Sequence, residues 1–211
     1  LALAQLSYAR MPVNVPRLDA EATDVDLAMV GVRDLLRAEC YDDMFGKVWS
    51  PSMNVDLLRA MCESPRWRDL RVGGYVDEFD PETTKQFSAC VFDVGDGSSY
   101  VAFRGTDSTI VGWKEDFAMA FRRPVAAQES RRAVSGRHRR APGRLAHGRR
   151  PFQRRQSGGV CGRNAPAAVQ ERLIAVFCHD GPGFDADFFD TPGYARVAPL
   201  VDKSVPESSI V

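Results

Sequence analysis

The spacing of apolar residues along the chain changes near residue 70. Before that point, apolar residues recur every three to four positions, as they do on the buried face of a helix. Thr23 or Asp24 is placed to cap one such helix, and Pro65 to end another. The first seventy residues therefore predict three helical segments, at 1–9, 25–36 and 54–64.

Beyond residue 70 the pattern becomes that of strands. Phe87, Ala89 and Val91 alternate with polar residues and so share one face of a strand. Residues 100–103 are wholly apolar, which is typical of a strand covered on both faces. Asp96-Gly97 signals a hairpin turn between the two. Strands are expected at 71–79, 86–93, 100–103, 173–178 and 208–211, and helices at 108–121, 165–171 and 194–201.

Buried strands that alternate with amphipathic helices predict an α/β fold, with a mostly parallel sheet and helices on both faces. The 211 residues suit one domain. We expect helices, a hairpin and a buried strand over 1–122, an anomalous segment over 123–163, and the remaining strands over 164–211. The chain begins with Leu rather than Met and stops inside an apolar run, so we expect the domain to be incomplete.

Equal numbers of basic and acidic residues, 28 of each, conceal an uneven distribution. Residues 131–163 contain eleven arginines and no lysine, aspartate or glutamate, which leaves 17 basic residues against 28 acidic in the rest. A basic segment is therefore set into an acidic domain. Natural nucleic-acid-binding arms usually mix lysine with arginine and interleave aromatic residues, so nucleic acid is not the expected partner.

The remaining composition indicates a compartment. Five cysteines, with no Cys-x-x-C pair, argue against a disulfide framework and against a zinc site. No stretch approaches the roughly eighteen apolar residues of a membrane span. Residues 1–8 lack the basic flank and cleavage site of a signal peptide. We expect a cytoplasmic protein without a metal, a cofactor or an integral membrane segment.

The most specific motif is the run Tyr-Val-Ala-Phe-Arg-Gly-Thr-Asp-Ser at 100–108, followed by Trp113 and an acidic pair. This run resembles the class 3 lipases and their bacterial lipase-like relatives in the α/β-hydrolase superfamily. The resemblance implies an α/β-hydrolase-like fold in which backbone N–H groups near Thr106 and Asp107 hold an oxyanion. An ordinary strand-to-helix turn is the alternative interpretation of the same residues.

A second match covers Val-Phe-Cys-His-Asp-Gly-Pro-Gly-Phe at 176–184. The resemblance implies a catalytic acid here. Asp180 follows a strand and can orient a histidine, or it can simply shape a tight turn. Asp202, in a D-x-V-P-like context, is an equal candidate for the acid. The resemblance extends over 1–122 and 164–211 and is strongest at 98–121 and 173–184.

A serine hydrolase of this kind needs a G-x-S-x-G nucleophile elbow between these strands, and residues 131–163 do not contain one. The segment is rich in arginine, glycine, proline and alanine and contains no lysine. GC-rich DNA yields such a composition when it is read out of frame. Codon choices exist for 148–162 that encode V-G-G-H-S-K-G-G-N-L-A-V-Y-A-A in the adjacent frame, which restores an elbow. We therefore expect a frameshift, and an exposed, irregular segment at 125–163 without the central strand.

These expectations describe a fragment of a lipase- or esterase-like serine hydrolase. In the intact parent, a serine would attack the carbonyl of a small acyl ester or lipid, with a histidine as base. The chain has neither the elbow nor a recognisable catalytic histidine, so we expect it to be inactive. Two alternatives remain: a protein that binds nucleic acid or an anionic surface through its arginines, and a non-catalytic protein of the hydrolase fold.

Overall fold

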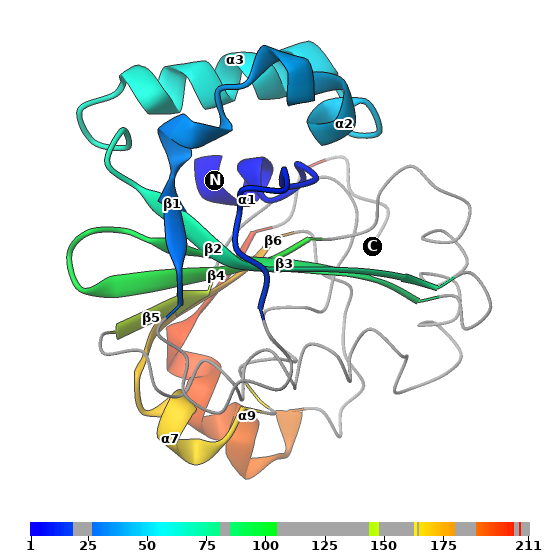
Figure 1. Ribbon diagram of the computed structural model, residues 1–211. Coiled ribbons are helices and arrows are strands. Elements are labelled where there is room, and N and C mark those ends of the chain that lie inside the picture. The colour runs from blue at the N-terminus through cyan, green and yellow to red at the C-terminus, as the bar shows by residue number, and fades with distance from the viewer. Residues whose placement is uncertain are drawn as a thin grey trace.

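The structure is a computed structural model that describes residues 1–18, 27–80, 85–104, 144–147, 163, 165–179, 189–204 and 207. Helices cover both faces of a central sheet (Figure 1). The helices of one face are α1 (Ala2–Leu6), α2 (Tyr41–Phe45) and α3 (Pro51–Glu63), and those of the other are α7 (Ala167–Gln170) and α9 (Pro192–Val197). The described residues also form the 3-10 helices η1 (Val32–Leu35), η2 (Ala38–Cys40) and η4 (Ala198–Leu200).

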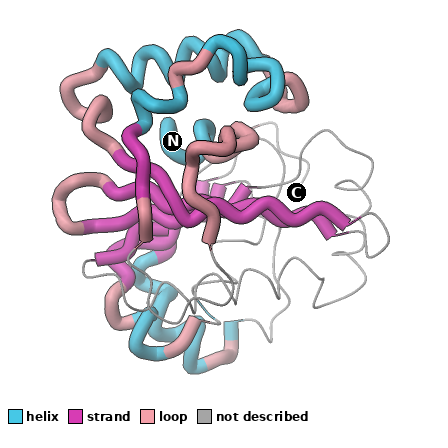
Figure 2. Tube along the Cα trace, viewed as in Figure 1, coloured by secondary structure: helices cyan, strands magenta, loops and turns pink. Residues whose placement is uncertain are grey.

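The sheet has seven strands in the described residues, and neighbours in the sheet are also neighbours in the sequence. The strands are β1 (Met29–Gly31), β2 (Arg71–Asp80), β3 (Lys85–Asp93), β4 (Ser98–Arg104), β5 (Arg144–His147), β6 (Leu173–His179) and β7 (Val201–Ser204). Strands β1 to β4 pair antiparallel, whereas β4 to β7 pair parallel. Figure 2 shows the long β2–β3 pair extending well beyond the other strands.

The expectation of a mostly parallel, α/β-hydrolase-like sheet is wrong. The main part of the sheet is the antiparallel set β1 to β4, which includes the two longest strands, and parallel pairing begins where β5 lies beside β4. The physical reason lies in the connections. Only residues 81–84 join β2 to β3, and residues 94–97 join β3 to β4. A parallel pair needs a crossover of a dozen or more residues, so these short links dictate hairpins.

Two of the three helices predicted in the first seventy residues are confirmed, and one is wrong. Helices α1 and α3 confirm the segments expected at 1–9 and 54–64, and α3 begins three residues early because Pro51 suits the first turn of a helix. The helix expected at 25–36 is wrong: Met29–Gly31 is an edge strand, η1 follows it, and residues 23–26 lie outside the described part. Pairing of Met29 with Gly73 outweighs the local helical spacing.

The predicted strands from 71 to 103 are confirmed, and so is the Asp96-Gly97 turn. Gly95 and Gly97 both have positive φ, and the Val94 amide donates to the Ser98 carbonyl to close the hairpin. Hydrogen bonds from Ser98 lower the pKa of Asp96 in that turn. The chain therefore closes the β3–β4 hairpin with local polar groups.

Each face of the sheet carries its own core. Phe87, Ala89 and Val91 pack with Val101 and the α7–α9 layer, as their alternation predicts. The opposite face packs against α1, α2 and α3 and is lined by a second set of strand residues: Val72, Tyr75, Cys90, Phe92, Tyr100 and Ala102. The strands of 71–104 are thus buried on both sides over most of their length.

Part of the arginine-rich segment is a strand. Residues 144–147 form β5 between β4 and β6, parallel to both. The expectation of irregular structure without a strand is therefore wrong for these four residues. The remainder of 125–162 lies outside the described part of the chain, as do the segments expected to form a helix at 108–121 and a strand at 208–211.

Candidate functional site

Of the four site residues expected from the lipase resemblance, one lies in the described part of the chain. Thr106, Asp107 and Asp180 lie outside the described residues. Asp202 lies on β7 beside Phe177 of β6 and is exposed to solvent. The described chain therefore offers no test of an oxyanion turn and no argument for choosing between the two candidate acids.

A row of polar residues instead crosses three strands. Asp77 of β2 pairs in register with Ser88 of β3, and Ser88 pairs in turn with Arg104 of β4. Side chains alternate between faces along a strand, so all three residues share the face of Cys90 and Ala102, which packs against α1 to α3. The row marks the point where the apolar face of the sheet becomes polar.

Arg104 and Asp77 form an ion pair over this row. Arg104 Nη2 donates to Asp77 Oδ1 at 3.1 Å, and only 10% of the arginine side chain and 14% of the aspartate side chain are exposed. Arg10 approaches the same carboxylate from the segment after α1, with 3.6 Å between its Nε and Asp77 Oδ2. The Arg10 amide donates to the Met44 carbonyl, which holds that segment against α2.

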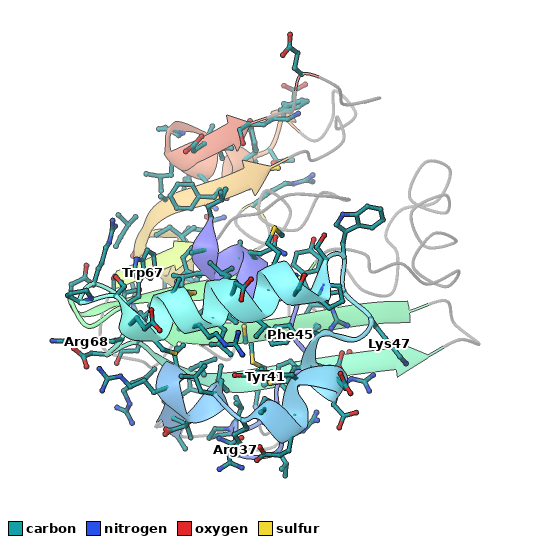
Figure 3. All side chains as sticks on the ribbon, turned by 90° about the horizontal axis from the view of Figure 1, so that it is seen from above. Arg37, Tyr41, Phe45, Lys47, Trp67 and Arg68 are labelled. Atoms are coloured by element: carbon teal, nitrogen blue, oxygen red, sulfur yellow. The ribbon has the colours of Figure 1, made fainter. Side chains whose placement is uncertain are left out.

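A small pocket opens beside the ion pair. It has about 30 Å³ of free space, and it lies between the segment after α1, the α2–α3 region and the end of β4. Three cations line it, namely Arg10, Lys47 and Arg104, together with Tyr8, Asp43, Met44 and Val48. Lys47 lies in the loop that leads to the N-terminal end of α3 (Figure 3).

The pocket presents more donors than acceptors. Arg104 Nε is buried and has no hydrogen-bond partner within the described residues, although it belongs to a side chain that lines the pocket. Among the described residues, the carboxylates of Asp43 and Asp77 stand against the three cations. An N–H group buried without a partner is costly, and an oxygen-bearing ligand would remove that cost.

The neighbouring ionisable groups beneath the row are neutral at physiological pH. Burial, with a contribution from the Asp77 carboxylate, raises the pKa of Tyr75. Burial likewise raises the pKa of Cys90 to about 12, although the Arg104 charge acts in the opposite direction. Neither a tyrosinate nor a thiolate is therefore present to act as a nucleophile or to cancel the charge of the pocket.

The described residues hold no candidate metal site. No group of three or more His, Cys, Asp or Glu side chains is arranged there to hold a metal ion. Of the helices in the described ranges, none combines the length and the apolar character needed to cross a bilayer.

Sequence reasoning missed most of the pocket. Arg104 belongs to the run that carried the lipase resemblance, but only the residues after it were expected to act. The sequence did contain a signal for Asp77. It lies two residues from Tyr75 on a predicted strand, so the two side chains share a face. Tyr75 is buried, and Asp77 therefore places a charge on the inward face of that strand. Arg10 and Lys47 gave no such signal, since only tertiary packing brings them to β4.

A family model described as Mbeg1-like matches residues 61–136 and 160–211 of the chain. The matched parts contain the row of Asp77, Ser88 and Arg104, whereas Arg10 and Lys47 precede them. The unmatched stretch between the two parts lies inside the arginine-rich segment. No curated protein and no solved structure matches the chain.

The lipase resemblance is therefore wrong as a family assignment. The matching family has a different name, and the antiparallel main sheet is not that of the α/β-hydrolase fold. Descriptions of this chain as a hydrolase, lipase or esterase have no support in either finding. The nine residues at 100–108 misled because a buried strand followed by a glycine turn is common to many folds.

Proposed function

This chain belongs to the Mbeg1-like family, and from the geometry of its pocket we propose that it binds a small organic acid through the acid's carboxylate. One observation carries this proposal. Arg104 is nine-tenths buried, lines the pocket, and has an Nε–H without a hydrogen-bond partner among the described residues. A carboxylate oxygen is the acceptor that a guanidinium binds most strongly.

The size and charge of the pocket favour a carboxylate over a larger anion. A pocket of about 30 Å³ accommodates only a small group, such as one carboxylate. Asp77 already pairs with Arg104 and Arg10, and Asp43 adds a second negative charge. The Asp43 carboxylate repels a dianionic phosphate more strongly than it repels a monoanion, so a carboxylate suits the pocket better.

We do not propose acyl-ester hydrolysis as the function of this chain. That expectation depended on the lipase family and on a hydrolase sheet, and both are overturned. Binding of nucleic acid through residues 131–163 stays an untested prediction, because only 144–147 and 163 of that segment belong to the described residues. The carboxylate pocket uses none of those arginines.

We propose a reducing, cytoplasmic setting for this binding protein. Cys40, Cys62, Cys90 and Cys178 form no disulfide in the described chain, and all but Cys40 are buried. Disulfide formation by the buried thiols would require the core to open, so a reducing compartment suits the fold.

Titration with sodium acetate, followed by NMR of the ¹⁵N-labelled chain, tests the proposal. Sodium chloride at matched ionic strength serves as the reference, because surface charges respond to salt alone. We expect saturable shifts at Arg10, Met44 and Val48. Lys47→Gln should weaken acetate binding about fivefold, since one partly exposed charge contributes ~1 kcal/mol.

Arg59→Gln is the matched control. Arg59 is an exposed cation of α3 that pairs with Asp56 at 3.4 Å and does not line the pocket. Its substitution changes the net charge by the same amount as Lys47→Gln, and it should leave the acetate affinity unchanged. Equal weakening by both variants, or shifts that chloride reproduces, would refute a carboxylate site.

A further inference from the structure

The pocket beside Arg104 contains an acceptor as well as a donor that a ligand can pair. The buried Arg104 Nε–H has no hydrogen-bond partner among the described residues. Asp43 also lines the pocket, and its carboxylate forms no ion pair within the part of the chain that the structure describes. Asp77 differs, because Arg104 and Arg10 already approach its two carboxylate oxygens. A ligand in this pocket therefore meets one donor and one acceptor of opposite charge.

The side of α2 that carries Asp43 faces the pocket. Asp43 and Met44 line the pocket, and so do Lys47 and Val48, each four residues further along the chain. The Val48 amide donates to the Phe45 carbonyl, so a turn continues beyond the end of the helix. Residues four apart lie on the same side of a helical turn. This side of α2 and of the turn after it therefore borders the pocket.

Packing holds this side of α2 in place before a ligand binds. Met44 is buried, and its carbonyl accepts a hydrogen bond from the Arg10 amide at 2.9 Å. Phe45 is also buried, and its ring centroid lies 6.2 Å from that of Tyr41 (Figure 3). Binding does not have to order the helix that carries Asp43, so less of the contact energy is lost.

From this arrangement we propose that the bound acid is a small α-amino acid, whose carboxylate binds Arg104 and whose ammonium group binds Asp43. The inference depends on the proposed carboxylate site and adds the chemical class of the ligand. An α-amino acid is a zwitterion at neutral pH, and one carbon separates its two charged groups. A pocket of about 30 Å³ favours that short spacing over a longer one. Met44 and Val48 supply apolar surface for the carbon between the charges.

An ammonium group suits Asp43 better than a hydroxyl group does. Hydrogen bonds that involve ionised groups are roughly twice as strong as those between neutral groups. A simple carboxylic acid anion leaves Asp43 unpaired beside its own carboxylate, and the two anions repel each other. A zwitterion adds an attraction at Asp43 that offsets this repulsion.

Three small acids at neutral pH and matched ionic strength test the inference: acetate, glycolate and glycine. They share the carboxylate and differ in the second group, since glycolate adds a hydroxyl and glycine an ammonium. Affinities for the full chain are measured by NMR titration from the backbone shifts at Met44 and Val48. We expect glycine to bind about fivefold tighter than acetate, and also tighter than glycolate.

Substitution of Asp43 separates the ammonium contact from the carboxylate contact. Asp43→Asn should weaken glycine binding and strengthen acetate binding, because it removes an attraction for one ligand and a repulsion for the other. Asp42→Asn is the matched control on the same helix, at a residue that does not line the pocket, and should change neither affinity. Both aspartates are exposed, and the dispersion of each spectrum verifies that the variant is folded.

The two failures are distinguishable. If acetate binds in the pocket but glycine binds no tighter than acetate or glycolate, the amino acid is refuted and the carboxylate site stands. The same conclusion follows if Asp43→Asn changes the affinities for glycine and acetate in the same direction. If neither acetate nor glycine shifts the pocket residues, the carboxylate site is wrong and this inference falls with it.

Discussion

Arg104 reaches Asp77 from two strands away. Its Nη2 donates to Asp77 Oδ1 at 3.1 Å across Ser88 of the intervening strand, so the ion pair joins β2 to β4 over β3. Both side chains are largely withdrawn from water. Their solvation is lost on folding, and their mutual attraction and the neighbouring Arg10 offset that loss. The same pair fixes the guanidinium that faces the pocket.

Asp77→Asn should destabilise the fold by about 3 kcal/mol, because it leaves Arg104 buried without its counter-charge. Urea unfolding at pH 7 measures the change. Asp56→Asn is the control, since Asp56 is exposed and pairs only with Arg59 on the same helix. We expect Asp56→Asn to lower the free energy of unfolding by less than about 0.5 kcal/mol. A similar loss for both would show that the Asp77 pair has no special role.

Asp43→Asn should strengthen acetate binding about threefold. The Asp43 carboxylate lines the pocket and repels an incoming anion, and its removal raises the local positive charge. Asp42→Asn changes the same net charge on the same helix at a residue that does not line the pocket, so it should leave the affinity as it is. Isothermal titration of both variants with acetate distinguishes a local effect from an effect of total charge.

Gly73→Ala should destabilise the chain by about 3 kcal/mol and loosen β1. A Cβ at this position would lie 2.3 Å from the Ala28 carbonyl oxygen, so β1 would have to move away from β2. Hydrogen exchange at the Val30 amide reports that loosening. Gly95→Ala meets no atom within 4 Å, and only its φ of 84° opposes the substitution, at a cost of about 1 kcal/mol. A larger loss of stability from Gly95→Ala than from Gly73→Ala would contradict the close packing of β1 on β2.

Stability should fall in alkaline solution because of Cys90. Burial raises its pKa from 9.0 to about 12, so the folded thiol stays protonated while the unfolded thiol ionises above pH 9. The stabilisation is therefore complete below pH 9 and is lost as the pH rises towards 12. Between pH 9 and pH 10 the loss from this thiol is about 1 kcal/mol. Cys90→Ala should show a correspondingly flatter decline in urea unfolding, and an unchanged slope would argue against the burial.

The nucleotide sequence should show a shifted reading frame over the interruption of the family match. The unmatched residues 137–159 hold eight arginines and no lysine, aspartate or glutamate, unlike the matched parts on either side. Independent sequencing reads of the gene test this directly. An unshifted frame in all reads would show that the segment is a genuine insertion.

Local patterns predicted the strands between residues 71 and 104 and the β3–β4 hairpin, because both depend on residues that are close in the sequence. The alternation of Phe87, Ala89 and Val91 and the Asp96-Gly97 turn together specify β3, its inward face and its link to β4. The strand at Met29–Gly31 escaped prediction because it is three residues long and depends on pairing with residues 71–73. The direction of pairing was misjudged because the wholly apolar strand at 100–103 was interpreted as part of a parallel sheet, although short links join β2 to β3 and β3 to β4.

The candidate site, too, was only partly predictable from the sequence. Given the two hairpins, the register that aligns Asp77, Ser88 and Arg104 could have been counted from the turns. Arg10 and Lys47 reach that row only because α1 and α2 pack over the sheet, and no periodicity in the first fifty residues encodes that docking. Sequence patterns therefore predicted the polar row in principle but not the pocket.

The Nε–H of Arg104 offers the most direct measurement of the central claim. Its ¹H–¹⁵N signal, assigned by comparison with Arg104→Lys, can be followed while the folded wild-type chain is titrated with acetate at constant ionic strength. The account predicts a downfield shift that saturates together with the backbone shifts at Met44 and Val48. A signal that stays in place while the backbone shifts saturate would contradict a carboxylate bound at Arg104.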